Sequence, residues 1–149
     1  MNLERYRRKI DFTKSSEPQG SERVSSGKIY VIQEHHASHL HWDLRLEMDG
    51  ALKSWAIPKE PPISDGVKRL AVEVEDHPIE YASFEGVIPE RQYGAGRVLI
   101  WDKGTYNLID MKEDKIVINI DGQRLKGEYC LIKTKLQKNG WLFFKNKVK

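Results

Sequence analysis

The chain has one cysteine, Cys130, among its 149 residues. A single thiol excludes a disulfide framework, so we expect a reducing compartment and a core that is held by packing alone. No hydrophobic run approaches the ~18 residues of a membrane-spanning helix, and the N-terminus lacks the apolar segment of a secretory signal. We therefore expect a soluble, cytoplasmic protein with no membrane partner.

An excess of charge of one sign is also lacking. Lysine and arginine together number 25 and aspartate and glutamate 22, which gives a net charge of +3. A balance this even does not by itself indicate a nucleic-acid partner. The basic residues are nevertheless concentrated at the two ends of the chain, with Arg5, Arg7, Arg8 and Lys9 at the start and a lysine-rich tail at the other end.

The sequence also lacks long stretches with the apolar periodicity of a helix. Short stretches instead alternate apolar and polar residues between turn signals, which favours an all-β fold. We expect strands at residues 28–33, 40–47, 52–57, 69–75, 97–102, 104–109, 115–120, 125–134 and 141–145. The chain length suits one domain, so we predict an antiparallel β-barrel-like core with long loops over residues 28–149.

Residues 1–27 have little hydrophobic pattern and are rich in Ser, Pro, Gly and charge. They are expected to form a flexible, loop-like N-terminal arm. Its arginine cluster is equally consistent with a solvated tail and with a basic arm on a phosphate backbone. Residues 79–96 are glycine-rich and irregular, and their aromatic content favours an ordered, functional loop.

The stretch from Leu40 to Glu47 alternates without a miss. Its four apolar side chains, beginning with Leu40, share the face that is expected to meet the core. His41, Asp43 and Arg45 share the other face, with same-face neighbours roughly 6.6 Å apart. Such a face is usually only the wet side of a sheet. The combination of His, Asp and Arg is, however, what a metal-assisted phosphate site requires.

A three-ligand metal site can be drawn from this stretch. His35 precedes His41 by six residues and lies in the expected connector at residues 34–39, so His35, His41 and Asp43 could converge on one ion. Two imidazoles and a carboxylate leave coordination positions open, as catalysis requires. The neighbouring His36 and His39 are expected to be connector residues and not ligands.

Two further residues follow the strand expected at residues 69–75. His77 is either an ordinary surface histidine or an anion contact and general acid for a leaving oxygen. Tyr81 is either a packing residue or a hydrogen-bond donor to the same oxygens. The pattern alone does not choose between these roles.

Long motifs in the chain resemble one known family. They read VIQEHHASHLHWDLRLEMDGALKSWAIPKEPP, RLAVEVEDHPIEYASFEGVIPERQYGAGRVLIWDKGTY and, near the end, LKGEYCLIKTK. They resemble the 3′-phosphoesterase domain of the bacterial end-joining enzyme DNA ligase D, and the likeness covers nearly the whole chain. Because 149 residues leave no room for a ligase or polymerase domain, we expect a stand-alone version.

The resemblance implies a set of site residues. The metal ligands would be His35, His41 and Asp43, and the catalytic and phosphate-contacting residues would be Arg45, His77 and Tyr81. Further phosphate or substrate contacts are implied at five positions: Gln33, Lys59, Arg69, Asp11 and Glu17. In the arm, the family usually has arginine before the aspartate, where this chain has Ile10, so a basic contribution from the arm would have to come from Arg7, Arg8 or Lys9.

The resemblance also implies an activity in DNA repair by non-homologous end joining. The enzyme would remove a 3′-terminal ribonucleoside as a phosphodiesterase, and then the remaining 3′-phosphate as a phosphomonoesterase. The expected cofactor is manganese, although two histidines and an aspartate also suit zinc or cobalt. The expected partners are a DNA primer-template with a 3′-ribonucleotide or 3′-phosphate end and a separate repair ligase and polymerase, and the protein itself is expected to be a monomer.

Two alternatives stay open at this point. One is a non-catalytic nucleic-acid-binding β-barrel with a structural metal, although structural zinc sites normally close with four ligands and often use cysteine. The other is a phosphoesterase for a small phosphate ester.

Overall fold

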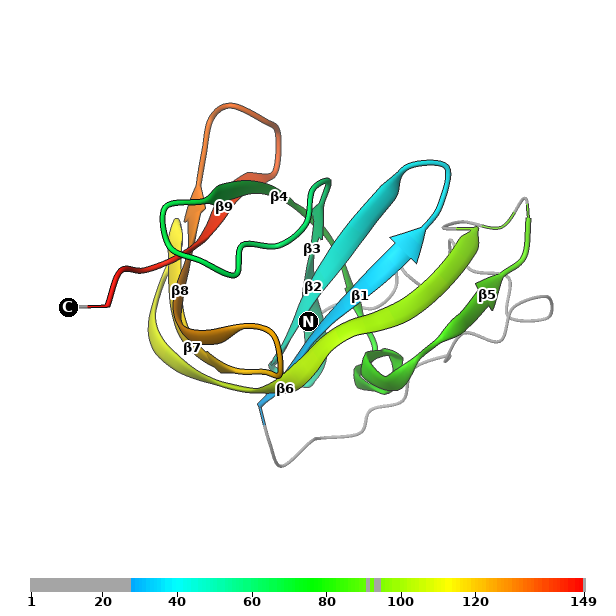
Figure 1. Ribbon diagram of the computed structural model, residues 1–149, viewed down its shortest axis with the longest axis horizontal. Coiled ribbons are helices and arrows are strands. Elements are labelled where there is room, and N and C mark those ends of the chain that lie inside the picture. Colours follow the sequence, from blue (N-terminus) through cyan, green and yellow to red (C-terminus); the bar gives the residue numbers. More distant parts are fainter. Residues whose placement is uncertain (1–27, 91, 93–94, 149) are drawn as a thin grey trace.

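The computed structural model describes residues 28–90, 92 and 95–148. Within these ranges the chain forms nine strands and one 3-10 helix, η1 (Figure 1). In chain order the elements are β1 (Ile29–His36), β2 (Leu40–Met48), β3 (Ala51–Ile57), β4 (Lys68–His77), η1 (Ile79–Ser83), β5 (Gly86–Ile88), β6 (Gly96–Lys112), β7 (Lys115–Asp121), β8 (Lys126–Lys133) and β9 (Gly140–Lys145). None of the described residues belongs to a helix long and apolar enough to cross a membrane.

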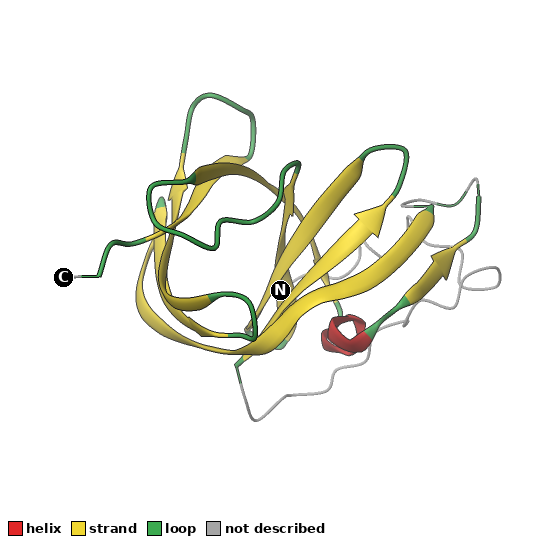
Figure 2. Ribbon diagram, viewed as in Figure 1, coloured by secondary structure: helices red, strands yellow, loops and turns green. Residues whose placement is uncertain are grey.

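Eight of the strands close into an antiparallel barrel, as the sequence predicted. Their order is β1-β2-β3-β4-β9-β8-β7-β6, and β6 pairs back onto β1, so the barrel has no free edge. β5 extends the sheet beyond β6 and lies outside the barrel beside η1 (Figures 1 and 2). The predicted arm, residues 1–27, lies outside the described residues, so the domain boundary stays a prediction.

The prediction of separate strands at residues 97–102 and 104–109 was wrong, because β6 is one continuous strand of 17 residues. Its first part pairs with β1, and from Thr105 onward it pairs with β7. Gly104 lies at this change of partner, where a Cβ atom would come within 2.0 Å of the Asp121 carbonyl oxygen. The glycine therefore permits a close approach of two backbones and does not break the strand.

β1 also extends further than predicted. The expected connector at residues 34–39 shrinks to residues 37–39, and the ladder with β2 continues to His36. The strand persists because β1 pairs with β2 on one side and with β6 on the other. This extension places His35 directly opposite His41. The two-residue turn between β2 and β3 has positive φ angles at Asp49 and Gly50, as an Asp-Gly hairpin turn requires.

The barrel interior is filled by alternating apolar side chains, including the fully buried Leu44, Leu46 and Trp55. Leu40 was expected in this core but is 44% exposed, because β2 begins there. On the outside of the barrel a second hydrophobic cluster gathers five residues: Leu52, Tyr81, Phe84, Ile88 and Val98. The predicted irregular loop thus contains η1 and β5, which cover part of the outer surface of the barrel.

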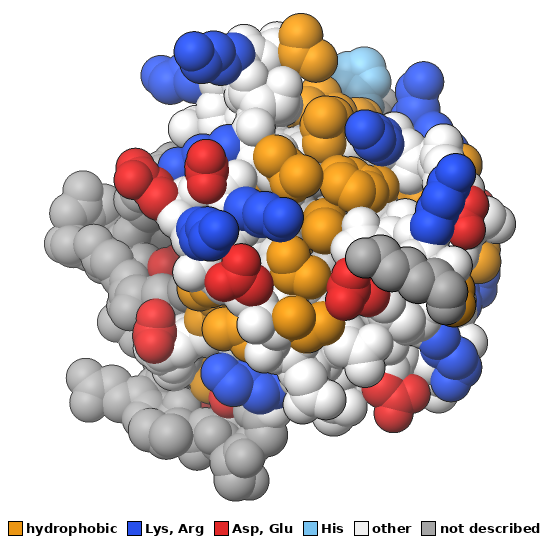
Figure 3. All heavy atoms as spheres, turned by 90° about the vertical axis from the view of Figure 1, so that its left-hand side faces the viewer, with side chains coloured by type: hydrophobic (Ala, Val, Ile, Leu, Met, Phe, Trp, Pro, Cys, Tyr) orange, Lys and Arg blue, Asp and Glu red, His pale blue; other side chains and the backbone are white. Residues whose placement is uncertain are grey.

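The outer face over β7, β8 and β9 shows a band of hydrophobic side chains between charged ones (Figure 3). Register places Val117 opposite Cys130, and Cys130 opposite Phe144. These residues alternate with the inward-facing residues of the core, so they point outward. The Cys130 thiol is nevertheless buried, and it donates to Asn146 Oδ1 at 3.3 Å.

Candidate metal and phosphate site

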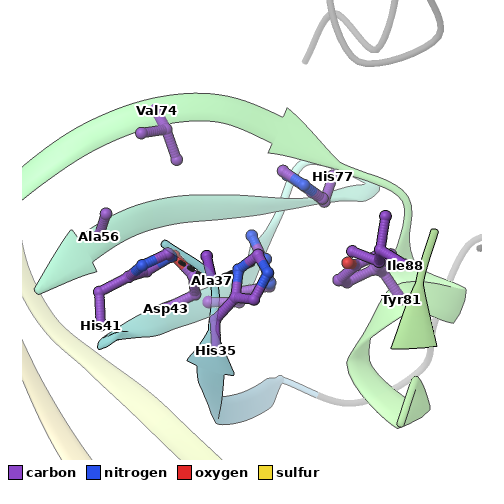
Figure 4. A pocket seen from close by; sticks show the side chains of 10 residues that line it. His35, Ala37, His41, Asp43, Ala56, Val74, His77, Tyr81 and Ile88 are labelled. Carbon is purple, nitrogen blue, oxygen red and sulfur yellow. Dashed lines mark ion pairs between the residues drawn. The ribbon is translucent and has the colours of Figure 1, made fainter. Parts of the chain in front are cut away.

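The polar face of β2 is not a wet surface. Asp43 is 6% exposed and Arg45 4% exposed. The ring of Tyr81 in η1 covers Arg45, and Asp43 lies among His35, His41 and Arg45. Beside these residues lies a cavity of about 210 Å³ (Figure 4). One part of its lining is made of side chains that carry polar groups: His35, His41, Asp43, Arg45, His77 and Tyr81. The other part is apolar: Ala37, Ala56, Val74 and Ile88.

Three candidate metal ligands meet at one end of this cavity. One ligand atom each from His35, His41 and Asp43 can be chosen so that all lie within 4.8 Å of one another. Asp43 Oδ2 lies 3.3 Å from His41 Nε2 and 3.7 Å from His35 Nδ1. Strand register explains the meeting, since His35 faces His41 across β1 and β2 and Asp43 follows His41 on the same face. His36 instead pairs with Glu34 at 2.6 Å, and His39 is exposed.

The orientation of His41 fits a metal ligand. Its Nδ1 lies 3.1 Å from the carbonyl oxygen of His39. A carbonyl can only accept, so Nδ1 carries a proton, and Nε2 lies on the side of Asp43, where its lone pair can bind a cation once this nitrogen is deprotonated. A backbone acceptor on the far ring nitrogen is the usual way in which proteins orient a ligating histidine. The donor set of two imidazoles and one carboxylate therefore fits a divalent cation.

The charged groups of the cluster shift one another's pKa values. Burial alone would raise the pKa of Asp43, but hydrogen bonds from His35 and His41 and the charge of Arg45 outweigh it, so the pKa lies well below its usual range. Burial would lower the pKa of His41, but the hydrogen bond and the negative charge of Asp43 raise it above its ordinary value. Asp43 is therefore a carboxylate at neutral pH, as metal binding requires.

Arg45 is held on several sides. Its Nε donates to Gln33 Oε1 at 2.7 Å and its Nη1 donates to Ser54 Oγ at 2.9 Å. Its guanidinium carbon lies 4.8 Å from the ring centre of Tyr81, and its Nη2 lies 3.6 Å from Asp43 Oδ2. Since the side chain also lines the cavity, its remaining N–H groups can donate to an anion beside the metal ligands.

His77 and Tyr81 lie across the cavity from the metal cluster (Figure 4). Their ring centres are 4.9 Å apart, and the rings meet edge to face. His77 Nδ1 lies 3.0 Å from the carbonyl oxygen of Glu75, so this nitrogen carries the proton. Both residues are buried at the point where β4 ends and η1 begins. The structure thus brings the pair to the same cavity as Arg45.

Other predicted residues lie apart from the cavity lining. Lys59 is exposed beyond the end of β3, and Arg69 donates from Nε to the Glu60 carbonyl oxygen at 2.8 Å. Gln33 is fully buried behind Arg45. Asp11 and Glu17 lie outside the described residues.

Sequence reasoning missed Ser54 and the apolar wall of the cavity. Ser54 is fully buried and lies directly opposite Arg45 in the ladder between β2 and β3. The signal was available, because a two-residue turn at Asp49 and Gly50 fixes this pairing. The small side chains of Ala37 and Ala56 carry no such signal, since only the packing of η1 and β5 turns that surface into a cavity wall.

The profile of the DNA ligase D 3′-phosphoesterase domain matches residues 33–133. The chain belongs to this phosphoesterase family. The multifunctional non-homologous end joining DNA repair protein LigD of Mycobacterium tuberculosis is 48% identical over 138 residues, which cover 89% of the chain. The multifunctional non-homologous end joining protein LigD of Pseudomonas aeruginosa is 45% identical over an alignment of 155 positions that covers 97% of the chain. In both relatives the matching region is 18% of the protein, so the chain resembles one part of a longer protein.

Proposed function

We propose that the protein is a divalent-metal-dependent phosphoesterase that heals DNA 3′ ends during non-homologous end joining. In the first step it removes a 3′-terminal ribonucleoside and leaves a 3′-phosphate. In the second step it removes that phosphate and leaves a 3′-hydroxyl group. The observation that carries the proposal is the cavity in which three candidate metal ligands face Arg45, His77 and Tyr81. The family's description and its relatives in DNA repair support the same reaction class.

The side chains suit the hydrolysis of a phosphate ester. Arg45 donates to non-bridging oxygens of the scissile phosphate, and its fixed guanidinium orients them. Water forms the new bond to phosphorus and releases one proton to the solvent, while the bond to the leaving oxygen breaks and that oxygen takes up one proton. His77, when cationic, can supply this proton from Nε2, because Nδ1 is held by the Glu75 carbonyl. Tyr81 beside it can donate a hydrogen bond to the same oxygens.

His35, His41 and Asp43 would hold the metal. A divalent cation at this place would polarise a phosphoryl oxygen and offset its charge. We propose manganese as the cofactor on the family resemblance, while the same donor set also suits zinc or cobalt. Lys59 and Arg69, which lie outside the cavity lining, are proposed to contact the phosphate backbone of a longer DNA substrate.

An end-resection assay tests the proposal. The substrate is a 5′-labelled DNA primer with one 3′-terminal ribonucleotide, annealed to a longer template, with manganese or with EDTA. We expect shortening to a 3′-phosphate and then to a 3′-hydroxyl, with no reaction in EDTA. His41→Ala should abolish both steps, whereas the matched control His39→Ala, an exposed histidine two residues away, should retain them.

Two results would overturn the proposal. Full activity of His41→Ala would refute the site. Tight binding of the primer-template without cleavage, with any of manganese, zinc or cobalt, would instead favour a non-catalytic nucleic-acid-binding barrel.

A further inference from the structure

A chain of buried hydrogen bonds runs across three strands behind the cavity. Ser54 Oγ donates to the Leu52 carbonyl oxygen at 3.0 Å and accepts from Arg45 Nη1. Arg45 Nε donates to Gln33 Oε1. The amide nitrogen of Gln33 then donates to two carbonyl oxygens of the η1 segment, Tyr81 O at 2.7 Å and Phe84 O at 3.1 Å. The chain therefore joins β3, β2 and β1 to η1.

Donors and acceptors in this chain match at every link. Arginine can only donate, so the oxygen of the Gln33 amide must face it and the NH₂ group must face the two carbonyls. Ser54 has one hydroxyl proton, which the Leu52 carbonyl takes, so its oxygen is left to accept from Arg45. A buried network satisfied in this way has one arrangement and resists rearrangement.

We propose that Gln33 and Ser54 are positioning residues, which hold Arg45 and the Tyr81 segment in a fixed relation to the metal ligands. Both are fully buried and neither lines the cavity, so they act through Arg45 and do not touch the substrate. This inference rests on the proposed function and replaces the expected substrate contact of Gln33. Arg45 needs such support because its side chain is long and flexible, and a misplacement of ~1 Å in a catalytic group lowers the rate about 100-fold.

The first measurement is hydrogen exchange by NMR, which does not depend on enzymatic activity. In metal-free protein, the Nε–H proton of Arg45 should exchange slowly with solvent, because it is buried and bonded to Gln33; Arg45→Lys assigns its NMR signal. Ser54→Ala removes the acceptor of Arg45 Nη1 and the donor to the Leu52 carbonyl oxygen, and Gln33→Met removes the acceptor of Arg45 Nε and both donors at similar volume. We expect at least tenfold faster exchange in Gln33→Met. Tyr129→Phe is the control, since it deletes a buried hydrogen bond, to the Pro62 carbonyl oxygen, that is not part of this network.

The second measurement follows kcat and KM on DNA with a 3′-phosphate, together with manganese affinity by electron paramagnetic resonance. We expect kcat to fall 10- to 100-fold in Ser54→Ala and Gln33→Met, while manganese affinity stays within threefold of wild type. Ser54→Thr, which keeps the hydroxyl, should recover most of the loss. A merely structural role would lower kcat and the number of manganese sites per protein by the same factor, the folded fraction, and would leave KM unchanged, as is expected for Tyr129→Phe.

The outcomes separate this inference from the proposed function. If wild type is active and both variants keep kcat within twofold, the positioning role is refuted. If wild type shows no activity on any 3′ end, the proposed function fails, and the exchange rates alone then decide. If the Nε–H proton of Arg45 exchanges at the wild-type rate in the Ser54→Ala and Gln33→Met proteins, the positioning role of these two residues is refuted. Faster exchange would support it. If Gln33→Met does not fold, the comparison of Ser54→Ala with Ser54→Thr tests the positioning role.

Discussion

The buried carboxylate of Asp43 allows a quantitative test of the site in the metal-free protein. In Asp43→Asn the shape is kept and the charge is lost, while Arg45 stays buried at 4% exposure beside the neutral Gln33 and Ser54. Breaking a buried ion pair by removing one partner costs about 3–5 kcal/mol. Asparagine can still hydrogen-bond, so we expect the lower end, about 3 kcal/mol of unfolding free energy. For a domain of this size that corresponds to a fall in Tm of roughly 6–12 °C.

The same substitution should change the pH dependence of stability. The pKa of His41 is raised in the folded state, so its contribution is present below its unfolded pKa of about 6.5 and is lost as the pH rises through the folded pKa. The pKa of Asp43 is lowered, so its contribution is present above about 3.8 and is lost on acidification. Without the carboxylate, the raised pKa of His41 loses its main cause. The loss of stability above pH 6.5 should therefore flatten in Asp43→Asn.

Urea unfolding with EDTA between pH 5 and pH 9, followed by the fluorescence of the four tryptophans, measures both effects. Glu47→Gln is the matched control, because Glu47 is a carboxylate on the same face of β2, 6% exposed, and lies outside the metal cluster. It accepts a hydrogen bond from the Ile29 amide at 2.9 Å. An Asp43→Asn protein within 0.5 kcal/mol of wild type, or with the same pH slope as wild type, would refute the reasoning; that margin is about the additivity error of such measurements.

Three further predictions concern other parts of the molecule. Arg45→Ala should lower kcat/KM by an amount equivalent to ~2–5 kcal/mol of activation free energy, while manganese affinity stays unchanged. If metal titration shows that manganese affinity falls as much as kcat/KM does, Arg45 instead belongs to the groups that hold the metal. Asp102→Ala should cost about 2–6 kcal/mol in urea unfolding, because it orphans two buried donors, Tyr30 Oη and Leu125 N; unchanged stability would contradict the burial of this network. Ala56→Leu should narrow the cavity and raise KM for DNA about tenfold or more without changing manganese affinity, and an unchanged KM would show that substrate does not approach this wall.

Much of the fold could be predicted because alternation with a period of two is a local property. The strict pattern of residues 40–47 identified β2, and the Asp-Gly turn after it identified the hairpin with β3. The prediction failed where a distant backbone decides the outcome. Gly104 looked like a strand break, but its role follows from the Asp121 carbonyl that packs against it. Leu40 fitted the pattern but lies at the exposed start of its strand.

The candidate site divides in the same way. The residue types and spacing of His35, His41 and Asp43 pointed to a metal site, and register was enough to bring them together. His77 and Tyr81 could not be assigned from the pattern, because their distance from Arg45 depends on how η1 folds back over the barrel.

By itself, the sequence determined the all-β pattern, the family and the candidate metal ligands, because these depend on side-chain chemistry and on neighbours within a hairpin. Only the tertiary structure decided that the polar face of β2 is buried, that Gln33 lies behind Arg45, and that Ser54 belongs to the site. The physical reason is that burial depends on what covers a surface. Over Arg45 the cover is Tyr81 of η1, a residue more than thirty positions further along the chain, which is held there by its packing with Phe84 and Ile88 against the barrel.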